Sequence, residues 1–223
     1  MNKQERFLDY KKRVFACKDC PLWETRTNVV IGDGNIDAKI VLVGEGPGEN
    51  EDLQGRPFVG RAGKLLEEVL LENGLTREEV WITNIIRCRA TIREEGSVRN
   101  RPPRPQEVQA CKKWLEEELS IVKPKVIVCL GAPSAEVIIH KGFRMTEERG
   151  RWFKSVYAPF AIATYHPAYV LRQPGRAFDE LRWMLSEDIA EARRRAESLQ
   201  EEEIEERIII PPAEEGGEQL NLF

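Results

Sequence analysis

The sequence predicts an α/β fold, a three-layer α/β/α sandwich around a central parallel sheet of four strands. Four short runs rich in Val and Ile predict the strands: residues 39–44, 80–86, 125–131 and 160–165. They are continuously apolar, as strands buried on both faces are. Helical patterns alternate with these runs, and such alternation is typical of a parallel sheet with helices on both faces.

Each interval between the strands contains a helical pattern. Residues 62–73 place apolar side chains at helical spacing and stop at Gly74, and residues 105–122 begin at a proline. A shorter helix is expected over residues 133–140 and a long final one over 178–199. Residues 92–105 are expected to form a polar, basic loop.

The domain is expected to span residues 1–199, followed by an acidic tail over residues 200–223. The tail has no core-forming pattern and is expected to be disordered. The net charge of the chain is −4, but residues 191–223 alone carry −6, which leaves +2 on residues 1–190. Nucleic acid therefore remains open as a partner of the body. The excess of Glu and Arg is a compositional sign of a thermophile.

The N-terminus and the apolar runs of the sequence do not predict a secreted or membrane protein. The first six residues are polar or charged apart from Met1, and no apolar run approaches the roughly 18 residues of a membrane span. We therefore expect a soluble, cytoplasmic protein with no membrane partner.

Five cysteines in such a protein more often indicate a metal site or catalysis than disulfides. Cys129 lies inside a buried strand and is expected to act as a small core residue. Cys17 and Cys20 form a Cys-x-x-Cys pair, and Cys88 and Cys111 follow later. These four suffice for one tetrahedral thiolate site. The residues alone leave zinc, an iron–sulfur cluster and no metal as alternatives.

Ligands of parallel sheets gather at the carboxyl ends of the strands. The first strand is followed by the glycine-rich turn 44–48, which could hold a phosphate. However, Pro47 lacks a backbone donor, and three acids follow within residues 49–52. We therefore favour a turn that lets a substrate approach the backbone closely and that carries the carboxylate of Glu45.

Three further side chains are candidates for a site at these strand ends. Phe58, between two turns, could stack on a planar ligand or anchor its loop in the core. Asn84 could read one edge of a base or cap its own loop. His166, followed by Pro167 and an apolar-then-basic loop, suits catalysis next to a polyanion. The other histidine, His140, is expected to lie on the surface.

Together these features resemble the family 4 uracil-DNA glycosylases over about residues 5–195. The resemblance rests on the turn Gly44-Glu45-Gly46-Pro47-Gly48, the loop 55–60, Thr83-Asn84, the block His166-Pro167-Ala168-Tyr169-Val170-Leu171-Arg172 and the four cysteines. It implies that Cys17, Cys20, Cys88 and Cys111 bind a structural [4Fe-4S] cluster. It also implies thermostability.

Two departures limit what can be transferred. The loop between Cys88 and Cys111 looks longer and more basic than is usual for the family, but contains no histidine. A related branch forms a covalent DNA adduct through a histidine at about this place, so we exclude that activity. Relative to family 1 enzymes, Glu45 replaces a Gln, Gly46 the water-activating Asp, and Gly48 the Tyr that excludes thymine.

The resemblance implies a base excision repair hydrolase that flips uracil out of DNA and leaves an abasic site. Phe58 would stack on the uracil, and Asn84 would accept from N3–H and donate to O4, a pattern that cytosine reverses. Backbone groups of Gly46 and Pro47 would line the pocket. Leu171 would fill the vacated stack and Arg172 would bind a phosphate.

For catalysis, the resemblance implies that His166 donates a hydrogen bond to uracil O2 and stabilises the departing anion. Glu45 is our candidate for positioning the attacking water or stabilising the sugar cation. Glu51 is the second candidate, either for the water or for crowding the thymine methyl group. A solvated acid in a charged loop is the competing interpretation of Glu51.

The expected partner is uracil-containing DNA, single- or double-stranded, and the protein is expected to be a monomer. The terminus Gln219-Leu220-Asn221-Leu222-Phe223 resembles a shortened sliding-clamp-binding motif. Two competing hypotheses are an iron–sulfur or zinc module that binds nucleic acid without cleaving it, and a nucleotide-binding α/β protein.

Overall fold

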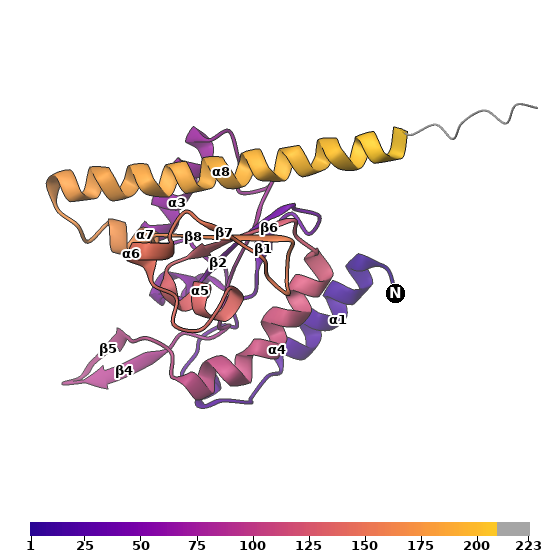
Figure 1. The fold of residues 1–223 in the computed structure, drawn as a ribbon. Coiled ribbons are helices and arrows are strands. Elements are labelled where there is room, and N and C mark those ends of the chain that lie inside the picture. The colour runs from indigo at the N-terminus through magenta and orange to yellow at the C-terminus, as the bar shows by residue number, and fades with distance from the viewer. Residues whose placement is uncertain (209–223) are drawn as a thin grey trace, which may run out of the picture.

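A mainly parallel sheet forms the middle layer of the structure, a computed structural model that describes residues 1–208 (Figure 1). The strand order is β1-β3-β2-β6-β8-β7. The four inner strands are parallel and correspond to the four predicted ones: β2 (Ile40–Gly44), β3 (Trp81–Asn84), β6 (Val126–Leu130) and β8 (Phe160–Thr164). The predicted architecture is confirmed.

The described sheet has six strands rather than the expected four. The additional strands are β1 (Asp33–Gly34) and β7 (Trp152–Phe153), which pair antiparallel to the outer parallel strands. Each is only two residues long, too short to produce a recognisable hydrophobic pattern. The strand count inferred from the sequence was therefore too low.

Alternate residues of each inner strand pack into two separate cores, one on each face of the sheet. In β2, Val41 and Val43 belong to one core, and Ile40 and Leu42 belong to the other. The first core is covered by α1 (Lys3–Phe15), α4 (Pro105–Val122) and α5 (Ala132–Ile138). The second is covered by α3 (Arg61–Glu72), α7 (Pro167–Val170) and α8 (Gly175–Ile208) (Figure 1).

A two-stranded hairpin lies apart from the central sheet, where the sequence predicted a loop over residues 92–105. It consists of β4 (Thr91–Glu94) and β5 (Ser97–Asn100). Residues 92–100 are all exposed. With no buried face, these strands show no alternation of apolar and polar residues, which explains why the sequence did not reveal them. The remaining short elements are η1 (Pro21–Glu24), α2 (Glu49–Gln54) and α6 (Met145–Glu148).

The last helix, α8, continues to Ile208 and thus beyond residue 199, where we expected the domain to end. Residues 200–208, expected to be disordered, are helical. The clamp-like motif at 219–223 lies outside the described residues. None of the helices in residues 1–208 is long and apolar enough to cross a membrane.

The register of the parallel strands brings the predicted site residues to one edge of the sheet. Gly44 at the end of β2 is paired with Asn84 at the end of β3, and Leu130 with Thr164 at the end of β8. The segments after these strands therefore lie together. They carry Glu45 and His166 and enclose the cavity described next.

Candidate active site

A cavity of about 570 Å³ opens at this edge, a size that suits a small-molecule or nucleotide ligand. Its walls come from the segments that follow β2, β3 and β8, and from residues 100–103. It brings together eight of the predicted site residues: Glu45, Gly46, Pro47, Glu51, Phe58, Asn84, His166 and Arg172. Leu171 does not line it and packs half-buried against the core. Its role as a wedge stays a prediction.

The side chain of Asn84 offers an unused acceptor at this cavity. Asn84 is only 2% exposed, and its Oδ1 atom finds no hydrogen-bond partner among residues 1–208. A buried polar atom without a partner costs free energy, so native proteins rarely leave one unless a ligand or water completes the bond. Because Asn84 also lines the cavity, its amide oxygen is available to a donor on a bound ligand.

Phe58 forms an apolar wall of the cavity next to His166. The two rings are stacked, with centroids 5.7 Å apart, and Phe58 is 7% exposed. Its backbone has a φ of 52°, in the left-handed region that non-glycine residues rarely adopt. Glu51 holds the loop in this conformation, since its Oε1 atom accepts hydrogen bonds from the backbone N–H groups of Val59 (2.9 Å) and Gly60 (2.8 Å).

The absence of a side chain at Gly44 makes room for both Phe58 and Asn84. A Cβ atom at Gly44 would lie 2.6 Å from Asn84 Oδ1 and 2.6 Å from Phe58 Cζ, well inside ordinary van der Waals contact. The aromatic ring and the amide therefore approach the backbone of β2 closely. Glycine at the end of this strand is a spatial requirement of the site.

His166 presents a neutral ring with one defined donor. It caps the N-terminus of α7, and its Nδ1 atom accepts a hydrogen bond from the Ala168 backbone N–H (3.0 Å). The proton of the neutral ring is therefore on Nε2. Burial, together with the positive charge of Arg172, lowers the pKa of His166 to about 4. At neutral pH, His166 can donate from Nε2 without carrying a charge.

Three acids of the turn after β2 already have partners. Glu51 holds the Phe58 loop, and the exposed Glu49 lies 3.5 Å from Arg89. Asp52 is buried and accepts hydrogen bonds from the backbone N–H groups of Thr27, at 2.9 and 3.0 Å, and of Asn28. These carboxylates stabilise the loops around the cavity.

Glu45 differs from these acids because its carboxylate makes no hydrogen bond or ion pair with any residue in the described part of the chain. It lines the cavity and is half-buried. Burial raises its pKa above the ordinary value. Among the acids considered for catalysis, Glu45 is the one whose carboxylate is free to act on a ligand.

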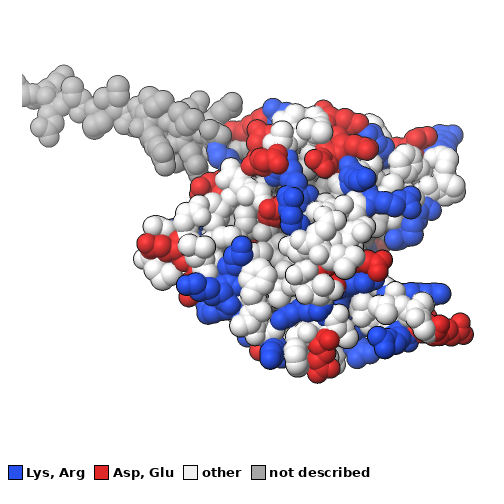
Figure 2. Space-filling view, turned by 180° about the vertical axis from the view of Figure 1, so that it is seen from behind, with Lys and Arg blue, Asp and Glu red and all other residues white. Residues whose placement is uncertain are grey.

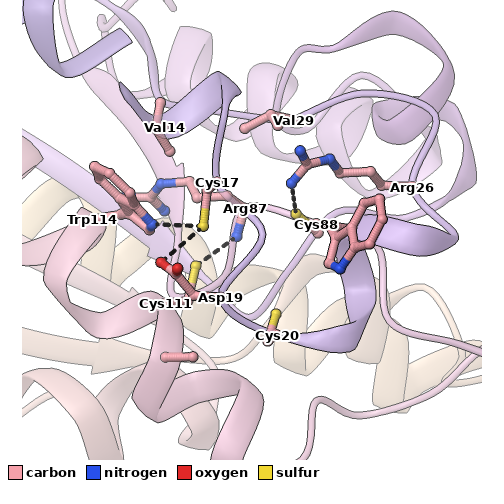
Figure 3. A pocket seen from close by; sticks show the side chains of 12 residues that line it. Val14, Cys17, Asp19, Cys20, Arg26, Val29, Arg87, Cys88, Cys111 and Trp114 are labelled. Carbon is pink, nitrogen blue, oxygen red and sulfur yellow. Dashed lines mark hydrogen bonds between the residues drawn. The ribbon is translucent and has the colours of Figure 1, made fainter. Parts of the chain in front are cut away.

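A second cavity, on the side of the sheet covered by α1 and α4, is lined by four of the five cysteines (Figure 3). Cys17 and Cys20 follow α1, Cys88 lies in the segment after β3, and Cys111 lies in α4. Residues far apart in the sequence thus place their sulfur atoms around one space. Cys129 lies in the middle of β6, fully buried, as expected of a core residue.

Three N–H groups point at sulfur atoms of this cavity (Figure 3). Arg26 Nη1 lies 3.2 Å from Cys88 Sγ, and Trp114 Nε1 lies 3.1 Å from Cys17 Sγ. The backbone N–H of Arg87 lies 3.2 Å from Cys111 Sγ. Such donors stabilise a thiolate, which is the form that binds metal. Burial opposes the charge and raises the pKa of Cys111 to about 12, although Arg87 favours the thiolate.

Arg87 connects the cysteine cavity with the first cavity. Its side chain is 1% exposed and pairs with the fully buried carboxylate of Glu118 at 2.5 Å, and it also donates to the backbone carbonyl of Asn84. The same carboxylate accepts from Tyr10 and Trp81. Although burial opposes its charge, Glu118 keeps the pKa of Arg87 above its ordinary value. One buried network thus holds the end of β3 in place.

Comparison with known proteins shows the family of this chain. A model of the uracil DNA glycosylase superfamily matches residues 31–191. A type-4 uracil-DNA glycosylase of Thermotoga maritima is 45% identical over 183 residues, which cover 82% of this chain and 90% of the relative. One of Archaeoglobus fulgidus is 44% identical, covering 74% of this chain and 83% of the relative. A type-5 uracil-DNA glycosylase of Thermus thermophilus is 30% identical over 83% of this chain and 86% of that relative.

The chain belongs to the type-4 uracil-DNA glycosylases. The family resemblance seen in the sequence is thereby confirmed. The structure also brings the glycine turn, Asn84 and His166 of that resemblance to one cavity. His140 is exposed, lies 2.7 Å from Glu148 and does not line this cavity, as expected of a surface residue.

Several residues that line the cavity of this type-4 glycosylase were not among the predicted site residues, and two polar ones are Asn100 and Arg61. Asn100 ends β5, and Arg61 begins α3, and both line the cavity. Arg61 follows directly after the glycine loop that carries Phe58, so its position next to a predicted site residue was a usable signal. For Asn100 no such signal existed, because only the fold of the hairpin brings it next to the turn after β2.

Proposed function

We propose that this protein excises uracil from DNA by hydrolysing the N-glycosidic bond, and leaves an abasic site and free uracil. The observation that carries the proposal is the cavity itself, which is lined by Asn84 with its unpaired amide oxygen, by Phe58 and by the neutral His166. Membership in a family of uracil-DNA glycosylases favours this activity over a nucleic-acid-binding module without catalysis.

Uracil enters the cavity only after it has been flipped out of the stack, at a cost of a few kcal/mol. Phe58 then stacks on the pyrimidine face. The Oδ1 atom of Asn84 accepts from N3–H and its amide group donates to O4. Cytosine presents the opposite pattern and would leave both buried groups unpaired, which favours uracil by several kcal/mol. Gly46 and Pro47 line the remaining wall, and Arg172 binds a DNA phosphate beside Leu171.

As the N-glycosidic bond breaks, negative charge builds on the uracil and positive charge on the sugar. His166 donates from Nε2 to uracil O2 and stabilises the developing anion as a neutral hydrogen-bond donor. Glu45 orients the attacking water or stabilises the sugar cation, and its free carboxylate supports this assignment over one for Glu51. Glu51 instead positions Phe58 through its hydrogen bonds to the loop.

Cys17, Cys20, Cys88 and Cys111 would hold a structural [4Fe-4S] cluster. The N–H donors directed at three of their sulfur atoms support thiolates at this place. In residues 1–208, no group of three or more His, Cys, Asp or Glu side chains is arranged so that it could hold a metal ion. The choice of a cluster over zinc therefore rests on the family resemblance. When bound, the cluster would join the segment after α1 to α4.

The activity is tested by incubating the purified protein with oligonucleotides that contain one uracil, single-stranded or paired with guanine, and then cleaving abasic sites with alkali. Strand breaks at the uracil are expected. The same oligonucleotides with cytosine or thymine at that position are the controls. Binding of uracil-containing DNA without any strand break would exclude the glycosylase and favour a binding module.

The partner assignments beyond DNA are finer proposals. We propose that the enzyme acts as a monomer, inside the cell with the chromosome, and that residues 219–223 bind a sliding clamp. Titration of the host's clamp with the full chain and with a chain ending at Glu215 tests the last of these. Only the full chain is expected to bind, and equal binding by both would refute the motif.

A further inference from the structure

The β4–β5 hairpin is a formed element that has no core of its own. It protrudes from the body, and residues 92–100 are exposed (Figure 1). Its two-residue turn, Glu95 and Gly96, has positive φ angles of 46° and 80°, as the turns that match the twist of paired strands require. Isolated two-stranded hairpins are marginally stable in water. Because residues 92–100 of this hairpin are exposed, its two faces are accessible to a partner.

The register of the hairpin separates its side chains into two faces. Thr91 is paired with Asn100 and Arg93 with Val98, so these four share one face, which we call the pocket-side face. The opposite face carries the other two pairs, Ile92 with Arg99 and Glu94 with Ser97. The pocket-side face therefore has one positive charge and no acid, whereas the charges on the opposite face cancel.

Asn100 identifies the pocket-side face as the one that continues the wall of the glycosylase cavity. Asn100 lines that cavity and accepts a hydrogen bond from Arg89 at 2.6 Å. The Arg93–Val98 pair lies two residues further along the strands, which places it roughly 7 Å further out on the same face. A strand of DNA that leads into the cavity past Asn100 would meet Arg93 and Val98 next.

The charge of Arg93 is available for such a contact. Arg101 at the base of the hairpin is paired with Glu107 at 2.6 Å, and Arg89 lies 3.5 Å from Glu49. Arg93, in contrast, makes no ion pair or hydrogen bond with any residue from 1 to 208. Figure 2 shows Lys and Arg side chains on the protruding hairpin and on the part of the body that faces it across an indentation. A polyanion could lie between them.

We propose that the pocket-side face of the β4–β5 hairpin is a DNA-binding surface, on which Arg93 binds a backbone phosphate and Val98 packs against the adjoining sugar. The contact concerns the strand that carries the flipped uracil, so this inference rests on the proposed function. It deepens that function, since it assigns substrate binding to the basic segment between Cys88 and Cys111. The neutral opposite face would remain in solvent.

The test compares Arg93→Gln with Arg99→Gln. Both variants remove one exposed, unpaired arginine from the same hairpin, so they are matched in charge, and neither removes a buried contact. The affinity of each for a uracil-free duplex is measured over a range of salt concentrations. Arg93→Gln is expected to bind roughly tenfold more weakly at low salt and to reduce the slope of log K against log [salt] by about 0.9, the contribution of one phosphate contact. Arg99→Gln is expected to bind as the unchanged protein does.

Equal weakening by both variants would show only a general effect of net charge and would overturn the proposal, as would unchanged binding by Arg93→Gln. The readout does not depend on excision. A protein that binds DNA through Arg93 but produces no abasic sites would refute the proposed activity and leave the hairpin surface intact. Normal excision, with equal DNA affinity of the two variants, would refute the hairpin surface and leave the proposed activity intact.

Discussion

Replacing Gly44 with alanine tests whether the close approach of Asn84 and Phe58 to β2 determines uracil recognition. The added methyl group would lie 2.6 Å from an atom of each side chain, so both must move by roughly 1 Å to reach ordinary contact. Neither can swing into solvent, because Asn84 is 2% and Phe58 7% exposed. The φ of Gly44 lies outside the left-handed region, so the backbone accepts alanine without strain.

Displacement of this size is expected to lower the rate of excision about 10²-fold. Misplacing a reacting group by about 1 Å can cost 10²-fold, and an unmade hydrogen bond at a buried amide costs about 1–3 kcal/mol, or a factor of 5–150. The assay is single-turnover excision of uracil from an oligonucleotide with excess enzyme. Circular dichroism and urea unfolding establish that the variant is folded, since overpacking of this kind costs about 1–3 kcal/mol.

The comparison with Asn84→Ala shows whether the methyl group acts through the amide. If it does, the double variant Gly44→Ala/Asn84→Ala loses much less than the product of the two separate losses. Fully multiplicative losses would mean that Gly44 acts independently of Asn84. A folded Gly44→Ala protein with the unchanged rate would refute the arrangement of the uracil site altogether.

Three further predictions concern His166, the cysteines and the buried ion pair. His166→Ala is expected to lower the excision rate about 10²–10³-fold. Because the pKa of His166 falls from its ordinary 6.5 to about 4, the folded protein binds fewer protons than the unfolded chain in this window. The free energy of unfolding should therefore fall as the pH drops from 6.5 to 4, and it should fall less in His166→Ala. A loss of excision rate with a midpoint near pH 6.5 that is absent from this variant would contradict the assigned pKa. Protein purified anaerobically is expected to be brown and to contain iron and sulfide in equal amounts. The colour should be retained by Cys129→Ala but weakened or lost when Cys17, Cys20, Cys88 or Cys111 is replaced. Colourless protein with stoichiometric zinc would refute the cluster. Glu118→Leu leaves Arg87 buried without its carboxylate partner and is expected to lower the free energy of unfolding, measured with urea, by about 3–5 kcal/mol. The double variant Arg87→Met/Glu118→Leu is expected to recover part of this loss. An equal or greater loss in the double variant would contradict the role of Glu118 as the partner of a buried charge.

The sequence predicted the parallel sheet because strands buried on both faces produce a simple hydrophobic pattern. Each inner strand is a continuous apolar run, and the helices between them repeat at 3.6 residues. Strand ends are therefore easy to locate, and Glu45, Asn84 and His166 follow from them. The hairpin has no buried face and the two edge strands are only two residues long, so neither produces such a pattern and both were missed.

Contacts between distant segments are the second kind of feature that the sequence did not predict. Nothing in the sequence near Glu51 indicates that its carboxylate holds the loop at Val59 and Gly60, and nothing near Asp52 indicates its hydrogen bonds to Thr27 and Asn28. Once these pairings are known, Glu45 remains as the free acid of the turn. Chemical type alone did not distinguish the two catalytic candidates, whereas their hydrogen-bond partners favour Glu45 over Glu51 for the proposed role.

The same pairings suggest how the two cavities depend on each other. Arg87 donates its backbone N–H to Cys111 and its side chain to the carbonyl of Asn84, so one residue joins the cysteine segment to the end of β3. In the proposed cluster, Cys88 and Cys111 also close the segment from which the hairpin protrudes. Closing a segment of this length limits how far its two ends can separate. The cluster would therefore fix both Asn84 and the base of the hairpin that we propose to bind DNA, without taking part in the reaction.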